Sequence, residues 1–328
     1  MNGNKLRISL APMAGFTDAP FRRICGEFGA DYAVSEMISA VALTMNDRKT
    51  GELAKITEGE PPVILQIFGH DPKIMAKAAE ILLSGNYRGC SYAMPPAGID
   101  INLGCPVKKI VNNGDGCALM LDPPLAAEIT KAVKEVCVQY GVPLSVKFRS
   151  GWDSVTAPDF AKIIADAGAD KITLHCRTRE QMYAPSADPE IARMTAEALG
   201  DRLHDGSLTF TGNGDVDSVE SANQYLERGC HEVAVGRAAL GNPWIFRELH
   251  DPEHFTPPTL QEIKSLVIRF VGEVVAEKGE QRGVRESRSR AAYFIKGMRG
   301  SAALRDQLNR AETYQDFTRI LYEWNPEE

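Results

Sequence analysis

The sequence lacks the features that mark several large classes of protein. Its seven cysteines include no C-x-x-C pair, so a disulfide framework and a zinc site both have little support. No apolar run approaches the roughly 18 residues that a membrane span needs. There is also no low-complexity segment, and no internal repeat beyond the strand and helix unit described below. We therefore expect a globular chain with no bound metal and no membrane association.

Positive charge is also in short supply. The chain has 37 basic and 44 acidic residues, a net charge of -7. This balance argues against a protein that binds nucleic acid over its whole surface, although it is compatible with a local basic patch. The segment from Met1 to Arg7 leads directly into a strand-like run and has no signal-peptide pattern. We expect a protein of the reducing cytoplasm, and we expect it to be a monomer.

Short apolar runs alternate with helical patterns up to about residue 240. The runs span residues 8–12, 32–36, 63–68, 99–102, 144–148, 171–175, 208–213 and 232–237. Helical spacing follows each run, for example from Ala19 to Phe28 behind the cap candidates Thr17 and Asp18. Eight such units in series predict an α/β fold, a closed (β/α)8 TIM barrel over residues 1–250, more than an open doubly wound sheet.

The pattern changes after residue 250. Residues 251–258, which include Thr256-Pro257-Pro258, predict a linker. Only helix-like segments follow, roughly at 260–278, 284–299, 301–310 and 313–324. Residues 259–328 are therefore expected to form a small all-helical C-terminal domain that docks on the barrel, because so short a chain buries little core alone.

A barrel carries its active site at the carboxyl ends of its strands. Each predicted strand here ends in a polar or special residue. A single one is explained as well by solvent exposure, but all of them together indicate a site. The residues at these ends are Pro12, Met13, Glu36, Gln66, Asn102, Lys147, His175, Asn213, Gly236 and Arg237.

Two glycine-containing loops follow the last two predicted strands, at 212–215 and 236–237. Glycine lets backbone N–H groups approach a phosphate, and Arg237 adds a fork of donors. Glycines that only make tight turns are the plain alternative. Two such loops at adjacent strand ends favour a ligand that carries phosphate.

Three further strand-end residues, and one cysteine, suit chemistry at the mouth. Lys147 follows an apolar run and is expected to point inward, where it would stabilise an anionic ring, although a surface lysine is the commoner case. His175 is ambiguous between a structural and a catalytic role. Gln66 offers a donor and an acceptor. Cys105 lies in a loop bounded by Gly104 and Pro106, which favours a reactive thiol over an inert buried one.

Seven motifs in chain order resemble the FMN-dependent tRNA-dihydrouridine synthases. The motifs are APMAGFTD at 11–18, SEM at 35–37, DINLGCP at 100–106, SVKFRSGWD at 145–153, HCRTR at 175–179, TGNGD at 211–215 and GRAALGNPWIF at 236–246. The resemblance covers nearly the whole chain. It implies a barrel that holds FMN, a helical tRNA-binding domain, and NADPH-driven reduction of the C5=C6 bond of uridine in tRNA.

The resemblance also implies roles for individual residues. Flavin N5 would deliver hydride to uridine C6, Cys105 would protonate C5, and Lys147 would offset the charge of the reduced flavin. Asn102 and Arg177 would contact the uracil or the tRNA backbone. The target uridine would leave its stack at a cost of a few kcal/mol. The implied FMN contacts are Pro12, Met13, Ala14, Gln66, Lys147, His175, Asn213, Gly214, Asp215, Gly236 and Arg237.

The sequence departs from the family pattern in three places. Cys176 stands where the family usually has glycine, which would alter loop geometry near the flavin. The stretch from Asn86 to Gly98 has the character of an insertion. Arg288-Ser289-Arg290 replaces a common Arg-Lys-His, so the RNA contacts of this region follow the family less closely.

Two other functions stay open. A flavin barrel that acts on a free pyrimidine, as in dihydroorotate or dihydropyrimidine dehydrogenases, uses similar chemistry, but such a substrate needs no extra basic surface. A non-catalytic RNA-binding protein that keeps FMN as a structural filler is disfavoured because Cys105, Lys147 and Asn102 occur together.

The helical segment carries a local excess of positive charge. Eight basic and two acidic residues lie between Arg282 and Arg310, a net +6 in a chain of net charge -7. A single helix over 284–299 would place four cations within an arc of roughly 80°, opposite its apolar residues. A solvated face is the usual explanation, but here the stripe predicts a tRNA-binding surface. The four cations are Arg285, Arg288, Lys296 and Arg299.

Overall fold

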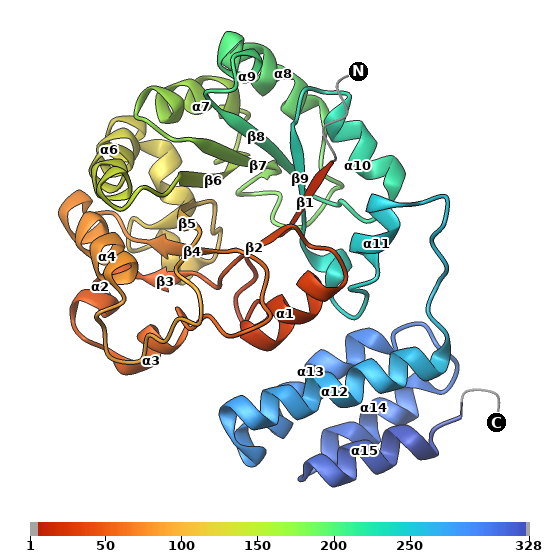
Figure 1. Ribbon diagram of the computed structural model, residues 1–328. Coiled ribbons are helices and arrows are strands. Elements are labelled where there is room, and N and C mark those ends of the chain that lie inside the picture. Colours follow the sequence, from red (N-terminus) through yellow and green to blue (C-terminus); the bar gives the residue numbers. More distant parts are fainter. Residues whose placement is uncertain (1–5, 326–328) are drawn as a thin grey trace.

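Eight parallel strands close into a barrel in the computed structural model, which describes residues 6–325 (Figure 1). Strand β1 pairs with β2 and β9, and β2 pairs with β4, so the pairing runs around the whole ring. A short additional strand, β3, pairs with β4. The predicted fold class is confirmed. The strands are β1 (Arg7–Leu10), β2 (Tyr32–Val34), β3 (Ile38–Ser39), β4 (Val63–Phe68), β5 (Gly98–Leu103), β6 (Leu144–Gly151), β7 (Lys171–Thr178), β8 (Thr209–Asn213) and β9 (Glu232–Val235).

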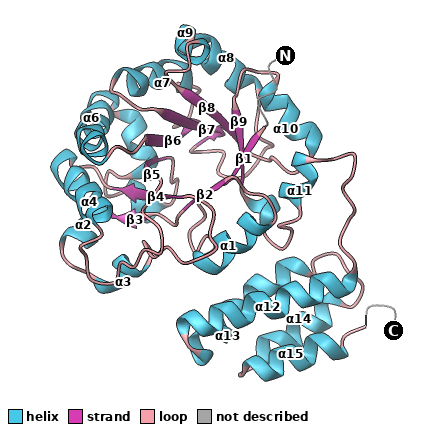
Figure 2. Ribbon diagram, in the orientation of Figure 1, coloured by secondary structure: helices cyan, strands magenta, loops and turns pink. Residues whose placement is uncertain are grey.

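Helices surround the barrel and connect its strands (Figure 2). The cap of the first helix is Asp18, whose carboxylate accepts a hydrogen bond from the N–H of Phe21, while the other candidate, Thr17, is not the cap. Of the segment from Met1 to Arg7, residues 1–5 lie outside the described residues. The helices are α1 (Ala19–Glu27), α2 (Ala40–Thr44), α3 (Arg48–Glu52), α4 (Pro72–Ser84), α5 (Lys108–Val111), α6 (Pro123–Tyr140), α7 (Ala157–Asp166), α8 (Glu190–Leu199), α9 (Asp201–His204), α10 (Val219–Leu226) and α11 (Ile245–His250), with 3-10 turns at Gly116–Leu121 and Arg237–Ala239.

Several strand ends differ from those predicted. Strands β1 and β9 end at Leu10 and Val235, earlier than expected. Pro12 has no N–H to donate to a neighbouring strand, so pairing of β1 stops before it. Strands β6 and β7 instead extend past the ends predicted for them, and their pairing has a register shift between Arg149 and Gly151. The predicted site residues at the ends of β1 and β9 therefore lie in loops.

Side-chain alternation along each strand separates the barrel interior from the helix layer. Lys147 of β6 reaches Asn213 of β8 across the intervening β7, so it faces the interior. The next residue, Phe148, packs on Phe160 of α7 with ring centroids 5.0 Å apart. Cys176 of β7 likewise faces outward, where Tyr225 is its neighbour. Tyr225 in turn donates to the backbone carbonyls of Asn213 and Gly214, so an effect of Cys176 on a loop near the flavin stays a prediction.

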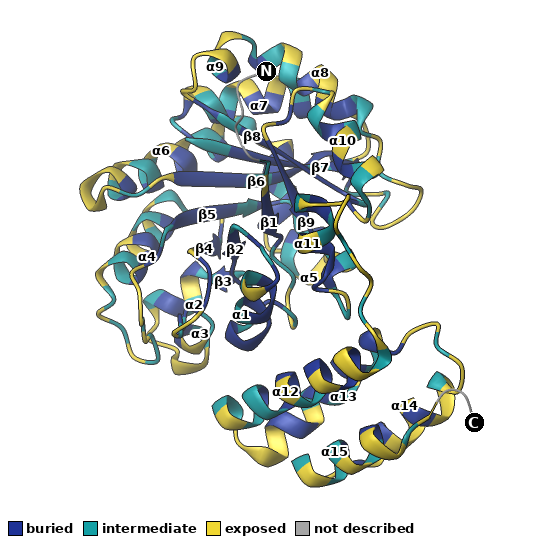
Figure 3. Ribbon diagram, turned by 45° about the vertical axis from the view of Figure 1, so that its right-hand side comes forward, coloured by how far each residue is buried: buried dark blue, intermediate teal, exposed yellow. Residues whose placement is uncertain are grey.

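Four helices form a separate bundle beside α1, which we call the helical bundle (Figure 1). Its outer faces are exposed, whereas the barrel strands are buried (Figure 3). The ring of Phe270 packs on that of Phe21 in α1, and Arg269 pairs with Glu27. The bundle consists of α12 (Leu260–Lys278), α13 (Glu280–Phe294), α14 (Ser301–Arg310) and α15 (Tyr314–Glu323).

The second helix of the bundle is not the predicted one. A helix was expected over 284–299, but α13 spans 280–294. Gly297 and Gly300 have φ values of +85° and +73°, a left-handed conformation that ends helices. Among the helices of residues 6–325, none combines the length and apolarity that crossing a bilayer requires.

The insertion-like stretch before β5 packs on the segment around α3. Ile56 and Tyr92 form an isolated parallel bridge, in which the N–H of Ile56 donates to the carbonyl of Ser91 at 2.8 Å. The hydroxyl of Tyr87 donates to the carbonyl of Asp47 at 3.1 Å. The stretch therefore covers the loop between β3 and β4 rather than projecting freely.

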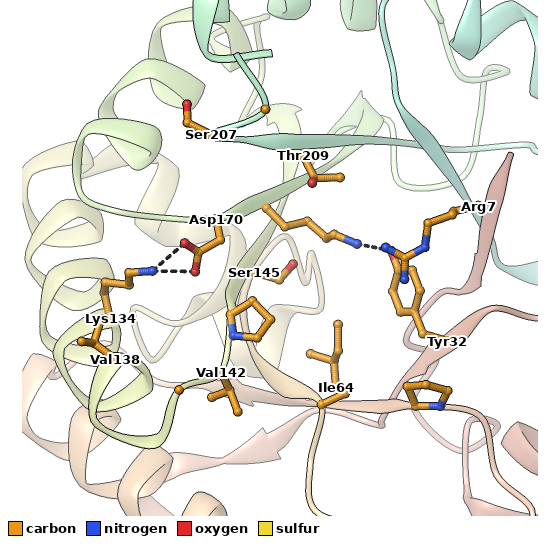
Figure 4. A pocket seen from close by; sticks show the side chains of 16 residues that line it. Arg7, Tyr32, Ile64, Lys134, Val138, Val142, Ser145, Asp170, Ser207 and Thr209 are labelled. Atoms are coloured by element: carbon orange, nitrogen blue, oxygen red, sulfur yellow. Dashed lines mark hydrogen bonds and ion pairs between the residues drawn. The ribbon is translucent and has the colours of Figure 1, made fainter. Parts of the chain in front are cut away.

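A cavity of about 630 Å³ lies at the amino-terminal end of the barrel (Figure 4). Its charged side chains are paired with one another. Lys134 contacts Asp170 at 2.6 Å, and Lys171 contacts Glu232 at 2.6 Å. Arg7 also pairs with Glu232, at 3.1 Å. Each of these three cations thus has a carboxylate bonded to it, although Arg7 and Lys171 share one.

Candidate active site

Cys105 lies in the loop after β5, and the side chain of Asn102 holds this loop. The side-chain oxygen of Asn102, Oδ1, accepts hydrogen bonds from the backbone N–H groups of Gly104, at 3.1 Å, and Cys105, at 2.9 Å. Such a turn, closed by a side chain, fixes the direction in which the loop leaves the strand. Asn102 therefore positions Cys105, and its predicted contact with the uracil stays a prediction.

A chain of hydrogen bonds connects this loop to the barrel interior. The side-chain nitrogen of Asn102 donates to the side-chain oxygen of Gln66 at 2.8 Å, and the side-chain nitrogen of Gln66 donates to the Asp100 carboxylate at 2.7 Å. Burial raises the pKa of Asp100, against hydrogen bonds from Ser145 and Gln66. Gln66 keeps one amide hydrogen beyond these contacts, so its predicted flavin contact is compatible with this arrangement.

The thiol of Cys105 is half-buried at the mouth. Burial raises its pKa, and the backbone of Val107 and the nearby Arg149 only partly oppose that rise. The thiol is therefore protonated at neutral pH, as a proton donor must be. Cys117 is close by, and its N–H donates to the Cys105 carbonyl at 3.1 Å, but its side chain is fully buried.

Lys147 reaches across the interior to a neutral partner. Its amine donates to the side-chain oxygen of Asn213 at 2.9 Å, and the side-chain nitrogen of Asn213 donates to the backbone carbonyl of Ala234 at 2.8 Å. Burial, and then the charge of Arg149, lower the pKa of Lys147 to about 8. The inward direction predicted for this lysine is observed. Among residues 6–325 no carboxylate is bonded to this amine, and Asp100 acts on it only through its charge.

His175 is neutral in this environment. Burial, and then the charges of four nearby cations, lower its pKa well below the ordinary value. One ring nitrogen lies 3.4 Å from the guanidinium of Arg177. This arrangement suits a hydrogen-bonding role better than a proton-donating one at neutral pH. The four cations are Lys147, Arg149, Arg177 and Arg237.

The loop after β8 contributes a carboxylate that organises two arginines. Asp215 pairs with Arg177 and, at 2.8 Å, with Arg237. Burial would raise the pKa of Asp215, but Arg177 and the N–H of Ala187 lower it overall. Arg177 is buried, and its third contact is the Pro185 carbonyl at 2.7 Å. Arg237 is about half-exposed at 53%, so it is the accessible arginine of this pair, and its predicted contact with a phosphate stays a prediction.

The predicted contacts in the loop after β1 lie beside Gly236. Met13 is fixed by Thr17, whose hydroxyl accepts from the Met13 N–H at 3.2 Å. A Cβ atom at Gly236 would meet nothing closer than the Met13 sulfur at 3.9 Å. A side chain at 236 would thus be in ordinary van der Waals contact with the loop after β1. Pro12 and Ala14 flank Met13 and are at least partly exposed.

The sequence-based site omitted two residues. Arg149 donates to the Gly104 carbonyl at 3.0 Å and to the Met182 carbonyl at 2.9 Å, so it connects the Cys105 loop to the loop after β7. The exposed ring of Tyr183 lies under Arg237, 4.9 Å from its guanidinium. Arg149 stands two residues after Lys147, and that spacing on a strand was a signal for the same inward face.

The predicted basic stripe is only partly assembled. Arg285, Lys296 and Arg299 are exposed, but only Arg285 lies on α13, and the other two follow its end. Arg288 donates two hydrogen bonds to the Ala311 carbonyl, at 2.6 and 3.1 Å. The predicted single arc is therefore wrong, because α13 ends at Phe294. The apolar side is confirmed by burial of Val284, Ala291, Phe294 and Ile295.

The donor set at the mouth fits FMN. Four cations surround His175, and the one described carboxylate bonded to them is Asp215. Such a surplus suits a phosphate and an electron-rich ring. Gly236, which has no side chain, precedes the half-exposed Arg237 at this end of the barrel. Fold and mouth together describe a (β/α)8 barrel with a cationic mouth and a protonated thiol.

The comparisons with known proteins place this barrel in a family. A family model described as "Dihydrouridine synthase (Dus)" matches residues 9–324. The tRNA-dihydrouridine synthase B of Pseudomonas aeruginosa is 36% identical over 314 residues, which cover 93% of this chain and 89% of the relative. A probable tRNA-dihydrouridine synthase of Treponema pallidum is 31% identical over 325 residues, with coverages of 97% and 92%. The chain belongs to the dihydrouridine synthase family, as its motifs indicated.

Proposed function

We propose that this protein reduces the C5=C6 bond of specific uridines in tRNA to dihydrouridine, with FMN in the barrel mouth and NADPH as reductant. The observation that supports this most is the combination of a protonated thiol at Cys105 with a cationic wall around Lys147. Residues 1–250 would form the catalytic part, residues 251–258 the linker, and residues 259–328 the part that binds tRNA, in the cytoplasm.

The residues at the mouth divide the work of the proposed reaction. FMN, when bound, supplies the hydride that goes to C6 of the uracil. Cys105 gives its proton to C5, and Asn102 holds the loop that presents this thiol. Lys147 places a positive charge beside the ring, where it stabilises negative charge. Arg237, with its orientation set by Asp215, would bind the phosphate.

Proton donation is the step for which this chain's geometry is most specific. The loop of Cys105 is held from below by Asn102 and from the side by Arg149, through the Gly104 carbonyl. A donor that is held in place avoids the cost of finding its orientation during the reaction. His175 is neutral, so it offers no competing acid at neutral pH.

The proposed function is tested with the purified holoenzyme. We expect a yellow protein whose flavin colour is bleached by NADPH without oxygen and restored by tRNA that lacks dihydrouridine, but not by free uridine. Dihydrouridine should then be detected in that tRNA. A colourless protein that FMN does not reconstitute would overturn the cofactor assignment. Reoxidation by free uridine as fast as by tRNA would instead indicate a small-molecule reductase.

A further inference from the structure

The loop after β1 is held from outside the barrel, by the helical bundle. Arg290 of α13 donates to both carboxylate oxygens of Asp18, at 2.7 and 2.9 Å, and to the backbone carbonyl of Phe16, at 2.7 Å. The two partners are 272 residues apart in the chain. A bidentate contact of this kind fixes direction as well as distance. The end of the loop Met13 to Asp18 is thus fixed by a residue of another part of the molecule.

Asp18 is a shared anchor for three elements. It caps α1, it accepts the contact from Arg290, and it accepts a hydrogen bond from Lys278, the last residue of α12, at 2.6 Å. Burial would raise its pKa, but Arg290 and Lys278 lower the pKa to about 2. The carboxylate is therefore charged at all physiological pH values. The Asp18 and Arg290 side chains are only 10% and 7% exposed, so solvent screens this pair little.

Apolar packing closes the same contact. The rings of Phe16 and Tyr293 meet edge to face with centroids 5.6 Å apart. The guanidinium of Arg290 lies 4.6 Å from the centroid of Phe270. The space enclosed by these rings and Arg290 is only about 10 Å³. The aromatic side chains therefore pack closely around the guanidinium.

The α13 helix touches the second predicted flavin loop as well. Gly241 follows the segment that begins at Gly236, and it packs directly against the backbone of Tyr293. A side chain at 241 would overlap that backbone, and the φ of Gly241 is +74°. One helix thus supports the loop after β1 and the loop after β9, which are neighbours at Met13 and Gly236.

The loop carries the constraint inward to the predicted FMN contacts. The N–H groups of Phe16 and Thr17 both donate to the Met13 carbonyl, at 3.0 Å. The N–H of Gly15 donates to Glu36 at 2.6 Å. These bonds make Met13 to Asp18 a closed turn. Holding Phe16 and Asp18 therefore also determines where Met13 and its neighbours lie.

We propose that Arg290 is a positioning residue for the cofactor, which holds the loop Met13 to Asp18 in the shape that binds FMN, so that the helical bundle is part of the cofactor site as well as the proposed tRNA-binding surface. The inference rests on the proposed function for the identity of the cofactor. It does not rest on it for the state of the loop, which is measurable in the protein without FMN.

A second ion pair between the same two parts of the chain gives a matched control. Arg269 of α12 pairs with Glu27 at the far end of α1, at 2.7 Å. It contacts the barrel but not the loop after β1. Replacing each arginine by methionine removes one interdomain ion pair and keeps most of the side-chain volume. If Arg290 only joins the two parts, Arg290→Met and Arg269→Met should have similar consequences for FMN.

The experiment compares both variants with the wild-type protein in two assays. Hydrogen–deuterium exchange of residues 12–18 in the FMN-free protein reports the loop, and titration with FMN reports the site. We expect Arg290→Met to speed exchange of the loop and to raise the FMN Kd about tenfold, as when the binding-competent loop falls to about a tenth of the population. Arg269→Met should change neither. Arg290→Lys, which keeps the charge, should restore part of the affinity.

The outcomes separate this inference from the proposed function. Unchanged loop exchange and unchanged FMN affinity in Arg290→Met would overturn the role of Arg290. If the wild-type protein does not bind FMN, the proposed function fails, while the exchange data still test the support of the loop. Should Arg290→Met not fold, Asp18→Asn serves instead, because it keeps the helix cap and weakens the same pair. Equal loop exchange in Asp18→Asn and wild type would then refute the proposal.

Discussion

Two partly buried lysines on neighbouring strands mark the two ends of the barrel, and their partners differ. Lys171, near the amino-terminal end of β7, contacts the Glu232 carboxylate at 2.6 Å and the Tyr32 hydroxyl at 2.8 Å. Lys147, nearer the mouth on β6, has one hydrogen-bond partner among residues 6–325, the neutral side-chain amide of Asn213, at 2.9 Å. Both lysines have lowered pKa values, with burial as the largest cause. The same residue type is thus neutralised at one end and left unneutralised at the other.

The difference shows how a structure separates support from function. A buried charge costs free energy unless a counter-charge compensates it. At the amino-terminal end the chain itself provides that counter-charge. At the mouth the chain leaves positive charge uncompensated, which is the condition expected where an anionic ligand binds. The volume of the cavity at the amino-terminal end, about 630 Å³, therefore does not by itself make that cavity a second candidate ligand site.

The largest effect is expected at the thiol of the mouth. Cys105→Ala should lower the rate of dihydrouridine formation by about 10² to 10⁴-fold, the usual contribution of a general acid. Reduction of bound flavin by NADPH should stay nearly normal, since that half-reaction does not need the proton. Single-turnover assays of each half-reaction measure this. Cys117→Ala is the control, and full activity in Cys105→Ala would assign the proton to another group.

A large effect on stability, without one on the site, is expected at the other end. Lys171→Met should lower the free energy of unfolding by about 3 kcal/mol, because Glu232 keeps only Arg7 as a cationic partner. Urea unfolding measures this, with Lys134→Met as a more exposed control. FMN affinity should not change. A lower FMN affinity in Lys171→Met would break the contrast between the two ends.

Retention of the phosphate should depend on Arg237. Arg237→Ala removes charge-assisted hydrogen bonds worth about 1.5 to 3 kcal/mol, so the FMN Kd should rise roughly 10 to 150-fold. Fluorescence titration of the FMN-free protein gives this value. Arg202→Ala, an exposed arginine paired with Asp166 on the barrel surface, is the control. Equal affinity in Arg237→Ala and wild type would exclude this guanidinium as the phosphate ligand.

Lys147 should reveal its uncompensated charge in the pH dependence of stability. Its pKa is about 8 in the folded protein, below the ordinary lysine value. Between these two pH values the unfolded chain binds more protons, so the cost of the buried charge, present at pH 7, is relieved as pH rises. The FMN-free wild type should therefore gain about 1 to 3 kcal/mol relative to Lys147→Met between pH 7 and 10. Urea unfolding at both pH values tests this, and a constant difference would contradict it.

The smallest effect is expected at the exposed cations of the helical bundle. Arg285→Glu with Lys296→Glu should raise the tRNA KM about tenfold and flatten its salt dependence by about two contacts. Arg288 is left in place because it holds the Ala311 carbonyl. The exposed Lys73 and Lys131 on barrel helices provide a control double variant. Matching KM values in the two double variants would show that the bundle cations are only solvated.

Most of the barrel was predictable because its signals are local. Each strand is a short apolar run, and each helix follows at a regular distance, so the eight units are visible without tertiary information. The location of the candidate site was also predictable, because the carboxyl ends of the strands of a barrel lie at the same end of it. Lys147 and Asn213 were placed at the mouth by this rule, and they lie within hydrogen-bonding distance.

The remainder depends on contacts between distant segments. The bond from Arg288 to Ala311 and the pair of Arg290 with Asp18 have no periodicity that a sequence shows. The early end of α13 was a different kind of error. Gly297 and Gly300 were visible, and they outweighed a continuous charge pattern because left-handed backbone ends a helix whatever its side chains.

The stretch before β5 and the segment around α3 are hydrogen-bonded to each other, which limits the changes of length that either segment tolerates. Ile56 exchanges backbone hydrogen bonds with Ser91 and Ala93, and Tyr87 reaches Asp47. Shortening either segment would leave the other with unpaired backbone groups at the rim of the barrel. These two segments lie more than 30 residues apart in the chain. An insertion or deletion in one of them should therefore be accompanied by a change of length in the other.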